Sequence, residues 1–428
     1  MTDPRYPVAA CISVGILIAA LATRNAGLFM AAIPVLAYAA ALLVARMRLP
    51  HPELDISRTP SSHRVCSGDD VRYTVAVTNC GAPLPLVGVL DVVPPDQPVQ
   101  EGIPSYLGPM GRDQDVRLSY TLRPTRGIHL HDHVTVASWT RTALAFQEHE
   151  LVCSTYVSAI PETEKLPPLT LAPRRTHAFA GPIMARAPGP GVDFFGCRAY
   201  VPGDDVRRLN WRALARTDRL IVNEYEQERT ADVTLVLDVR AQAHVEVGGR
   251  GTFEAACRAA ASLADHMIRQ GNRVGFLLYG QSIDWIQPAG GRFHLERILG
   301  AIVRAKPVRS FAFEDLAGIP ASIFPSGSQL ILLSSLPRDE DYDVPVQLAA
   351  RGYSVLVVYM NSESLQASAE EADDALALAL RIRSLRRDSA IRQMRRGGVR
   401  VLSWDTEEPL SVALHRARLD RGGRRRRS

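Results

Sequence analysis

The 428-residue sequence lacks several short motifs by which catalytic and metal-binding proteins are often identified. No GxxxxGK[ST] phosphate loop occurs anywhere in it, which argues against ATP hydrolysis by this chain. Its six cysteines contain no CxxC pair, so a zinc ribbon and a dithiol redox motif are both disfavoured. Scattered single cysteines of this kind are compatible with a reducing compartment.

Two apolar runs near the start of the chain predict a membrane hairpin over residues 1–50. They cover about residues 7–23 and 26–45, and a membrane-spanning helix needs about 20 predominantly apolar residues. A cleaved signal peptide followed by one span is the rival interpretation. Arg5, Arg46 and Arg48 flank the runs, whereas Arg24 lies between them, so the positive-inside rule places both ends in the cytoplasm. We therefore expect a multi-pass protein of the plasma or inner membrane with its soluble domains in the cytoplasm.

Residues 51–160 show the alternation of apolar and polar residues that is typical of β-strands. Residues 71–79 alternate in this way, and similar short segments follow with Pro and Gly between them, which predicts a β-sandwich. The stretch GDDVRYTVAVTNCG is similar to the opening hairpin of immunoglobulin-like repeat domains. In a regular strand His129, His131 and His133 would share one face, either as a metal site or as solvated side chains.

The rest of the chain divides into three parts. Residues 161–230 start as a linker rich in Pro, Arg and Gly and continue into one dense motif. Residues 231–412 alternate apolar strands with amphipathic helices, which predicts a doubly wound parallel sheet. Residues 413–428 end in RGGRRRRS; such a basic tail either attracts anionic lipid or nucleic acid, or is solvated and unfolded.

The dense motif, residues 191–226, combines a Pro-Gly pair, two adjacent carboxylates, several arginines and a tryptophan. The Pro-Gly pair suits a type II turn, after which Asp204 is expected to cap one helix that continues through Trp211. Three roles remain open: a structural clasp between the sandwich and the α/β domain, a partner-binding surface anchored on Trp211, or acid–base chemistry by Asp204 and Asp205. We expect the clasp, with Trp211 buried. The motif has no serine, and its cysteine has no neighbouring histidine, which argues against nucleophilic catalysis.

The same motif resembles the hallmark of a bacterial and archaeal family called domain of unknown function 58. The family core runs Arg-x-Tyr-x-Pro-Gly-Asp-Asp-x-Arg, then Asn-Trp, then Ala-Arg. This chain supplies Arg198, Tyr200, Pro202, Gly203, Asp204, Asp205, Arg207, Asn210, Trp211, Ala215 and Arg216. The resemblance implies a von Willebrand factor A-like domain after the hallmark, and work alongside a MoxR-type AAA+ ATPase.

Domains that resemble von Willebrand factor A often bind Mg²⁺ through Asp-x-Ser-x-Ser at the end of their first strand, and this chain departs from that motif. Asp238 occupies the aspartate position, but Arg240 and Gln242 stand at the serine positions. Mg²⁺ prefers oxygen ligands, and Arg240 places a fixed positive charge where the cation would lie. We therefore expect no metal and no other cofactor, with Asp238 paired to a nearby arginine.

The predicted fold is multidomain: an N-terminal transmembrane helical hairpin, an all-β immunoglobulin-like sandwich and an α/β doubly wound von Willebrand factor A-like domain. The predicted function is that of a non-enzymatic, membrane-anchored scaffold or adaptor in the assembly or maturation of a protein complex. Expected partners are the MoxR-type ATPase, membrane lipid and other membrane proteins of the same operon, but not nucleic acid. The alternatives are an enzyme that uses Asp204, Asp205 and the arginines, and a lipid or nucleic-acid binder that acts through the basic C-terminus.

Overall fold

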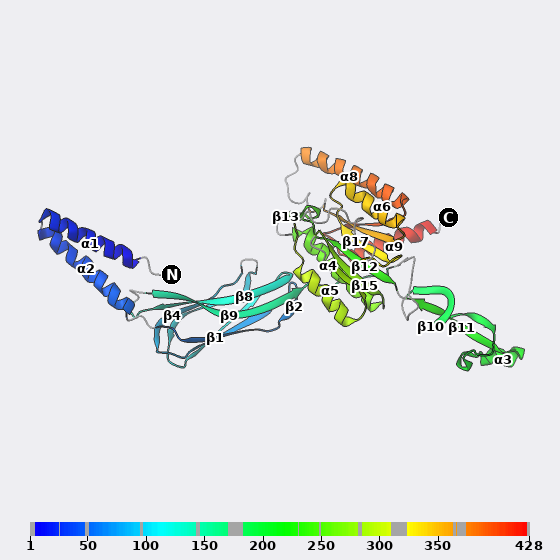
Figure 1. The fold of residues 1–428 in the computed structure, drawn as a ribbon, viewed down its shortest axis with the longest axis horizontal. Helices are drawn as coiled ribbons and strands as arrows, with labels where there is room; N and C mark the ends of the chain where they lie inside the picture. Colours follow the sequence, from blue (N-terminus) through cyan, green and yellow to red (C-terminus); the bar gives the residue numbers. More distant parts are fainter. Residues whose placement is uncertain are drawn as a thin grey trace. The chain divides into compact units, whose positions relative to one another are not determined.

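The computed structural model describes residues 5–24, 26–47, 51–94, 97–142, 146–169, 183–229, 231–247, 250–280, 285–309, 323–362, 365 and 374–425 (Figure 1). The chain divides into two compact units, Met1–Ile160 and Pro161–Ser428.

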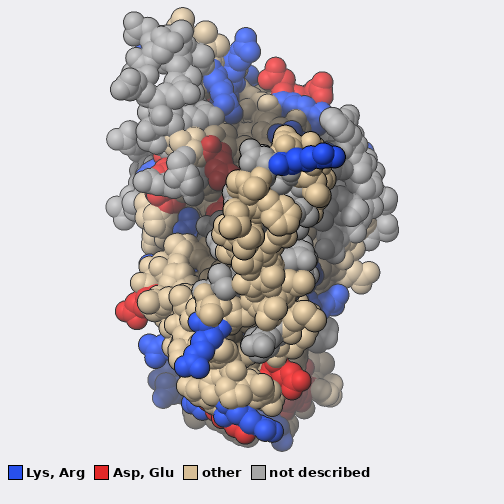
Figure 2. Space-filling model, turned by 90° about the vertical axis from the view of Figure 1, so that its left-hand side faces the viewer, with Lys and Arg blue, Asp and Glu red and all other residues tan. Residues whose placement is uncertain are grey.

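The first unit begins with two helices, α1 (Arg5–Thr23) and α2 (Ala26–Met47). Between them Arg24 takes a left-handed backbone conformation with φ of 46°. Several of their large apolar side chains are exposed, among them Ile18, Leu21, Phe29 and Met30. Few charged side chains interrupt the surface of this helical pair in the space-filling view (Figure 2).

The prediction that these helices form a transmembrane hairpin is wrong. Among the described residues, no helix combines the length and the apolar character that crossing a membrane requires. The prediction of a multi-pass membrane protein, which depended on these two spans, is therefore also wrong. Helix α1 reaches its 19 residues only by including Arg5 and Tyr6, so its apolar part is shorter than the helix.

The remainder of the first unit is a sandwich of two β-sheets. One sheet has the order β1 (Leu54–Pro60), β3 (Val71–Asn79), β7 (Asp115–Leu122), β5 (Val99–Gly102). The other has the order β2 (Arg64–Cys66), β9 (Phe146–Ile160), β8 (Gly127–Trp139), β4 (Leu84–Asp91), β6 (Ser105–Met110). Strand β3 explains the layering, because its apolar residues Val71, Tyr73, Val75 and Val77 are all fully buried in the core. The intervening polar residues face outward, as period-two alternation requires.

A buried ion pair links the two sheets. Arg58 on β1 donates through Nε to Asp91 on β4 at 2.9 Å and through Nη1 to the carbonyl oxygens of His131 and Cys153 at 2.8 and 2.6 Å. Tyr120 donates its hydroxyl to the same Asp91 carboxylate. Because an unpaired buried charge costs several kcal/mol, each member depends on the others.

The three alternating histidines do not share one face. A β-bulge in the β8–β9 ladder falls between His131 and His133, so His131 is buried while His133 is exposed. A bulge inserts one residue and reverses the side-chain alternation beyond it. The His129 ring contacts Gln97 and the Thr125 carbonyl oxygen instead.

The second unit contains a six-stranded sheet. Its order is β16 (Trp285–Ala289), β15 (Arg273–Tyr279), β12 (Asp232–Asp238), β17 (Gln329–Ser334), β18 (Ser354–Asn361), β19 (Arg400–Asp405). All neighbouring strands are parallel except β16, which is antiparallel to β15. Every residue of β12 is buried, as expected for a central strand covered on both faces.

Helices cover both faces of this sheet (Figure 1). One face carries α4 (Thr252–Arg269), α5 (Arg292–Arg304) and α9 (Leu410–Arg425), and the other carries α6 (Asp343–Ala350) and α8 (Asp374–Arg396). Smaller elements are β13 (Glu246–Val247), β14 (Arg250–Gly251) and the 3₁₀ helices η2 (Ala241–Ala243) and η4 (Asp339–Tyr342). Helix α9 corrects the predicted basic tail, because Leu410, Ala413 and Leu414 belong to the core and the helix continues past residue 412.

Candidate functional site

The hallmark residues lie on a two-stranded ladder that we call the hallmark arm, residues 183–229. Strand β10 (Ile183–Ala199) pairs antiparallel with β11 (Ile221–Arg229), and η1 (Val206–Arg208) and α3 (Trp211–Thr217) lie between them in the chain. Part of β10 had been assigned to a linker from its Pro and Gly content. Register shifts along the ladder accommodate this segment.

Ion pairs around Arg198 fix the turn at the start of the hallmark. Gly203 has φ of 108°, a conformation that glycine adopts without strain. The Asp204 carboxylate folds back onto β10, where it accepts two hydrogen bonds of 2.7 Å from Arg198 and one of 2.9 Å from the Val201 backbone N–H. Arg198 also donates through Nε to Glu224 on β11 at 2.8 Å. One guanidinium therefore ties the turn to both strands.

The single helix predicted after the turn is divided into two short ones, each with its own cap. Asp205, not Asp204, caps η1 by accepting from the Arg207 backbone N–H at 3.0 Å. Asn210 caps α3 by accepting from the Ala213 backbone N–H at 3.0 Å, and it also donates to Asn223 on β11 at 2.9 Å. The prediction of Asp204 as a helix cap is wrong because Arg198 competes for the same carboxylate.

Trp211 is exposed rather than buried. Its side chain is 65% accessible, at the first position of α3. Other large apolar residues of the arm are also exposed: Phe194, Val201, Val206 and Leu220. We call these five residues the apolar surface of the arm. The expectation that Trp211 is buried is wrong, because α3 has no buried residue with which to pack a tryptophan into a core.

The remaining hallmark residues differ in exposure. Tyr200 is half-buried, and its backbone N–H donates to the Leu220 carbonyl oxygen at 2.9 Å. Arg207 and Arg216 are exposed. The arm thus presents apolar and cationic side chains together, whereas its backbone geometry is set by the capping and ion-pair residues.

The carboxylates of the hallmark are poorly suited to acid–base catalysis. The hydrogen bonds from Arg198, followed by the one from the Val201 N–H, lower the pKa of Asp204 to about 2. An efficient general acid or base has a pKa near the working pH, so Asp204 is ionised and engaged at neutral pH. Asp205 uses one oxygen as a cap. The enzymatic alternative receives no support from this geometry.

A second candidate site lies outside the hallmark arm, at the carboxyl end of the parallel sheet. Asp238 ends β12, and Ser334 ends the adjacent strand β17. The chain goes from β12 to β15 on one side and returns to β17 on the other, so the strand order reverses here. Ligands of open parallel sheets bind at such a switch point.

Arg240 fills this position. Its Nε and Nη2 donate to the two carboxylate oxygens of Asp238 at 3.0 and 2.8 Å, and its Nη1 and Nη2 donate to those of Asp341 at 3.0 and 3.1 Å. The guanidinium carbon also lies 4.6 Å from the centre of the Tyr279 ring. The Arg240 side chain is 3% exposed, so one buried cation bridges two carboxylates.

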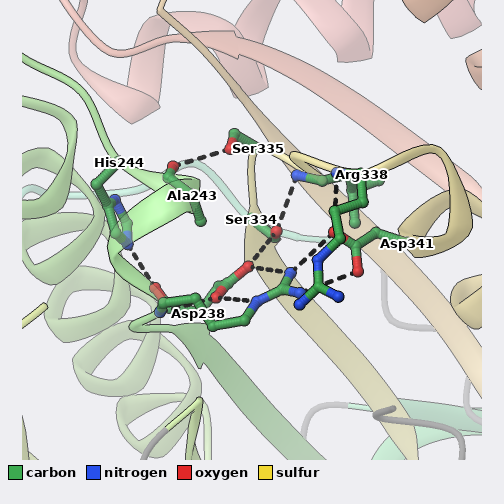
Figure 3. A network of polar contacts seen from close by, with 9 residues as sticks. Asp238, Ala243, His244, Ser334, Ser335, Arg338 and Asp341 are labelled. Atoms are coloured by element: carbon green, nitrogen blue, oxygen red, sulfur yellow. Dashed lines mark hydrogen bonds and ion pairs between the residues drawn. The ribbon is translucent and has the colours of Figure 1, made fainter. Parts of the chain in front are cut away.

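Hydroxyl and imidazole groups complete the network (Figure 3). Ser334 donates its hydroxyl to Asp238 at 2.6 Å, and Ser335 donates to the Ala243 carbonyl oxygen at 2.8 Å. His244 contacts the Asp238 carbonyl oxygen through Nε2 at 2.6 Å. The segment after β17 is therefore fastened to the segment after β12 at several points.

Burial and charge act in opposite directions on the titrating groups of this network. Burial alone would lower the pKa of Arg240, but the hydrogen bonds and charges of Asp238 and Asp341 raise it above its ordinary value. Burial lowers the pKa of His244 and raises that of Tyr279 to about 12. At neutral pH the network holds a charged guanidinium, a neutral imidazole and a neutral phenol.

The Arg240 side chain occupies the position beside Asp238 where a metal ion would bind in the Asp-x-Ser-x-Ser motif. Both Asp238 oxygens accept from Arg240, and one also accepts from Ser334. Within the described part of the chain, no group of three or more His, Cys, Asp or Glu side chains is placed to hold a metal ion. Asp238 and Arg240 could be identified from the sequence, but Asp341 could not, because it lies 101 residues from Arg240 and follows no recognisable motif.

Comparison with known proteins places the hallmark and much of the sheet in one family. Residues 196–358 match the family described as "Protein of unknown function DUF58". Uncharacterised proteins of Mycobacterium bovis and Mycobacterium tuberculosis are each 29% identical over 150 residues, which cover 35% of this chain and 47% of each relative. The aligned region thus spans about half the length of these relatives.

Two solved structures match the chain only locally. The CARDB domain of a Pyrococcus furiosus protein, in complex with di-metal ions, is 17% identical with a TM-score of 0.19 and covers 26% of this chain and 96% of its own. AvmM, which catalyses macrocyclization in alchivemycin A biosynthesis, is 11% identical with a TM-score of 0.18 and covers 26% of this chain and 93% of its own. Similarity this low supports no argument about fold or function. The family match, by contrast, confirms the predicted resemblance: residues 196–358 match the DUF58 family.

Proposed function

We propose that this DUF58 protein is an adaptor that docks a protein partner on the apolar surface of its hallmark arm. The observation that carries the proposal is the exposure of Trp211, which is 65% accessible on an arm held in shape by Arg198, Asp204 and Glu224. Tryptophan and arginine are the residues most often found as anchors at the centre of protein interfaces. Large apolar side chains left exposed together are a common mark of a protein interaction site.

The charge around this surface indicates what the partner presents. Arg207 and Arg216 are exposed near it in the chain, so an acidic rim on the partner would complement the arm and accelerate association. The family resemblance suggests a MoxR-type AAA+ ATPase as the partner class. The same family resemblance leads us to propose that the α/β unit is a von Willebrand factor A-like domain. The stretch at residues 68–81 leads us to propose that the sandwich is immunoglobulin-like.

Binding of a purified MoxR-type ATPase to the full chain, measured by biolayer interferometry, tests the proposal. Trp211→Ala should weaken binding by about 2 kcal/mol or more, roughly thirtyfold, as loss of an interface anchor does. Its melting temperature should stay near that of the wild type, since an exposed side chain contributes little to the core. Phe293→Ala is the matched control, because Phe293 is 91% exposed on α5, outside the arm.

Three results would count against the adaptor. The first is a wild-type chain that does not bind the ATPase, and the second is a Phe293→Ala variant that loses as much affinity as Trp211→Ala. The third concerns Asp204→Asn, which breaks the bidentate contact with Arg198. If that variant keeps its fold and its ATPase binding but loses all activity in a cellular complementation assay, the carboxylates have a chemical role.

A further inference from the structure

A cavity of about 420 Å³ opens beside the buried network, at the carboxyl ends of β17 and β18. Its volume is within the range of roughly 300–1,000 Å³ that small-molecule sites occupy. Three arginines of α8 line it, Arg383, Arg386 and Arg387, together with Tyr342 and Tyr359. It is independent of the hallmark arm, so the partner proposal does not bear on it.

The lining is strongly cationic. Arg383, Arg386 and Arg387 are spaced i, i+3 and i+4 on α8 and therefore project from one side of the helix. The lining contains one carboxylate, that of Asp339. Like charges gathered on one wall repel each other, and a bound anion relieves that repulsion.

The arginine wall is also partly preorganised. The Arg387 side chain is only 13% exposed and donates through Nη1 to Asn361 at 3.3 Å and through Nε to Asp388 at 3.2 Å. Helix α8 itself is fixed to the sheet by Ile391 and Met394, which lie in the core. A guanidinium held in this way loses less side-chain entropy when it binds a ligand.

Two neutral tyrosines also line the cavity. Tyr342 and Tyr359 are hydrogen-bonded to each other, and burial raises the pKa of both phenols. Their hydroxyls therefore remain protonated, and the charges of Arg383 and Arg387 act on both of them. Hydroxyl and guanidinium groups that converge on one space match the several oxygens of a phosphate.

The lining also includes three apolar residues. Leu336 and Pro337 come from the segment after β17, and Ile382 comes from α8. Ser335, in the same segment, is fastened to Ala243 at 2.8 Å, so this segment is held by the buried network. A cavity lined by both cationic and apolar side chains fits a ligand that has an anionic group and an organic body.

We propose that this cavity binds a small organic phosphate, with its phosphate group on Arg383, Arg386 and Arg387 and its organic part against Leu336, Pro337 and Ile382. An inorganic anion can pair with the arginines but has no organic part for the apolar residues, whereas an uncharged nucleoside has no anionic group for the arginines. A nucleotide such as ADP offers both groups and is a suitable probe.

Isothermal titration calorimetry of the full chain with ADP, inorganic pyrophosphate, citrate and adenosine tests the proposal. We expect ADP to bind more tightly than pyrophosphate, and citrate and adenosine to bind too weakly to measure. Arg383→Gln and Arg386→Gln should each weaken ADP binding by about tenfold or more, because each removes a charged donor. Both side chains are exposed, and thermal denaturation of each variant without ligand checks that it folds.

Arg392→Gln is the matched control, since Arg392 is exposed on the same helix but does not line the cavity. It should bind ADP within about twofold of the wild type. The proposal is overturned if neither ADP nor pyrophosphate binds at millimolar concentration, or if Arg392→Gln weakens binding as much as Arg386→Gln. Citrate that binds as tightly as pyrophosphate would replace the phosphate assignment with a carboxylate one.

Discussion

Replacement of Arg240 by methionine removes the one guanidinium that bridges Asp238 and Asp341. The side-chain exposures of these two carboxylates are 0% and 7%, so solvent cannot take over the role of the cation. Methionine keeps much of the volume of arginine and adapts to irregular space, so the cavity it leaves is small. The loss of stability then measures the uncompensated charge and not lost packing.

The expected cost is about 3–5 kcal/mol, the usual result of removing one partner of a buried ion pair. The lost contact with the Tyr279 ring, which lies 4.6 Å from the guanidinium carbon, adds about 1 kcal/mol. A loss of this size is a large part of the total stability of a typical domain. We therefore expect the α/β unit of Arg240→Met to unfold at a much lower denaturant concentration than that of the wild type.

Hydrogen exchange at the backbone amides of β12 and β17, followed in the full chain at rising urea concentration, reports the stability of this unit alone. Arg269→Met is the matched control: Arg269 pairs with Asp265 at 2.8 Å, but its side chain is 77% exposed. Water replaces that contact, so the control should be indistinguishable from the wild type. Equal losses for Arg240→Met and Arg269→Met would refute the account of the network as a buried charge bridge.

The same account predicts a rescue. In the triple variant Arg240→Met, Asp238→Asn, Asp341→Asn no buried charge is left at the site, and most of the lost stability should return. A triple variant that is less stable than Arg240→Met would indicate that hydrogen-bond geometry, and not charge, holds the segment after β17 in place.

Three further predictions follow from the contacts described above. Mg²⁺ or Mn²⁺ at millimolar concentration should leave the melting temperature of the wild type unchanged, because Arg240 fills the position of the cation; a metal-dependent rise would contradict this. Gly280→Ala should destabilise the α/β unit in thermal denaturation, because φ is 111° and the new Cβ would lie 2.5 Å from Arg240 Cγ, whereas Gly300→Ala on helix α5 should not. The sandwich should lose stability in urea titrations as the pH falls below about 6.5. Burial lowers the pKa of His131 in the folded state, so the unfolded chain takes up the proton first; His131→Gln should flatten this dependence, and an unchanged slope would disprove it.

Much of the local structure could be predicted from the sequence, because the alternation of apolar and polar residues and long apolar runs determine it. Residues 71–79 alternate in the sequence and form β3, and the apolar run around residues 232–238 forms β12. The hallmark turn was readable from its Pro-Gly pair, and Gly203 has the positive φ that such a turn needs. In each case neighbouring residues determine the outcome.

The parts that could not be read depend on residues far apart in the chain. Asp204 looks like a helix cap, but its carboxylate accepts from Arg198, which also donates to Glu224. Asp341 has no motif of its own and reaches Arg240 only because β12 and β17 are adjacent in the sheet. Helix α9 was not predicted, because its arginines suggested a basic tail. Its residues Leu410, Ala413 and Leu414 nevertheless have the helical spacing of a buried face. The apolar runs of α1 and α2 led to the opposite error: their composition predicted membrane spans that the structure does not contain among its described residues.

The polar contacts of the hallmark bear on why the arm has its shape. Ion pairs at partly exposed positions contribute little to stability, and the Arg198 side chain is 41% exposed. Its bonds to Asp204 and Glu224 are therefore better explained by the position they impose on the turn than by the energy they add. Trp211 remains exposed to solvent, and α3 has no buried residue against which it could pack. The fixed turn and the exposed Trp211 together support the proposal that the arm docks a partner.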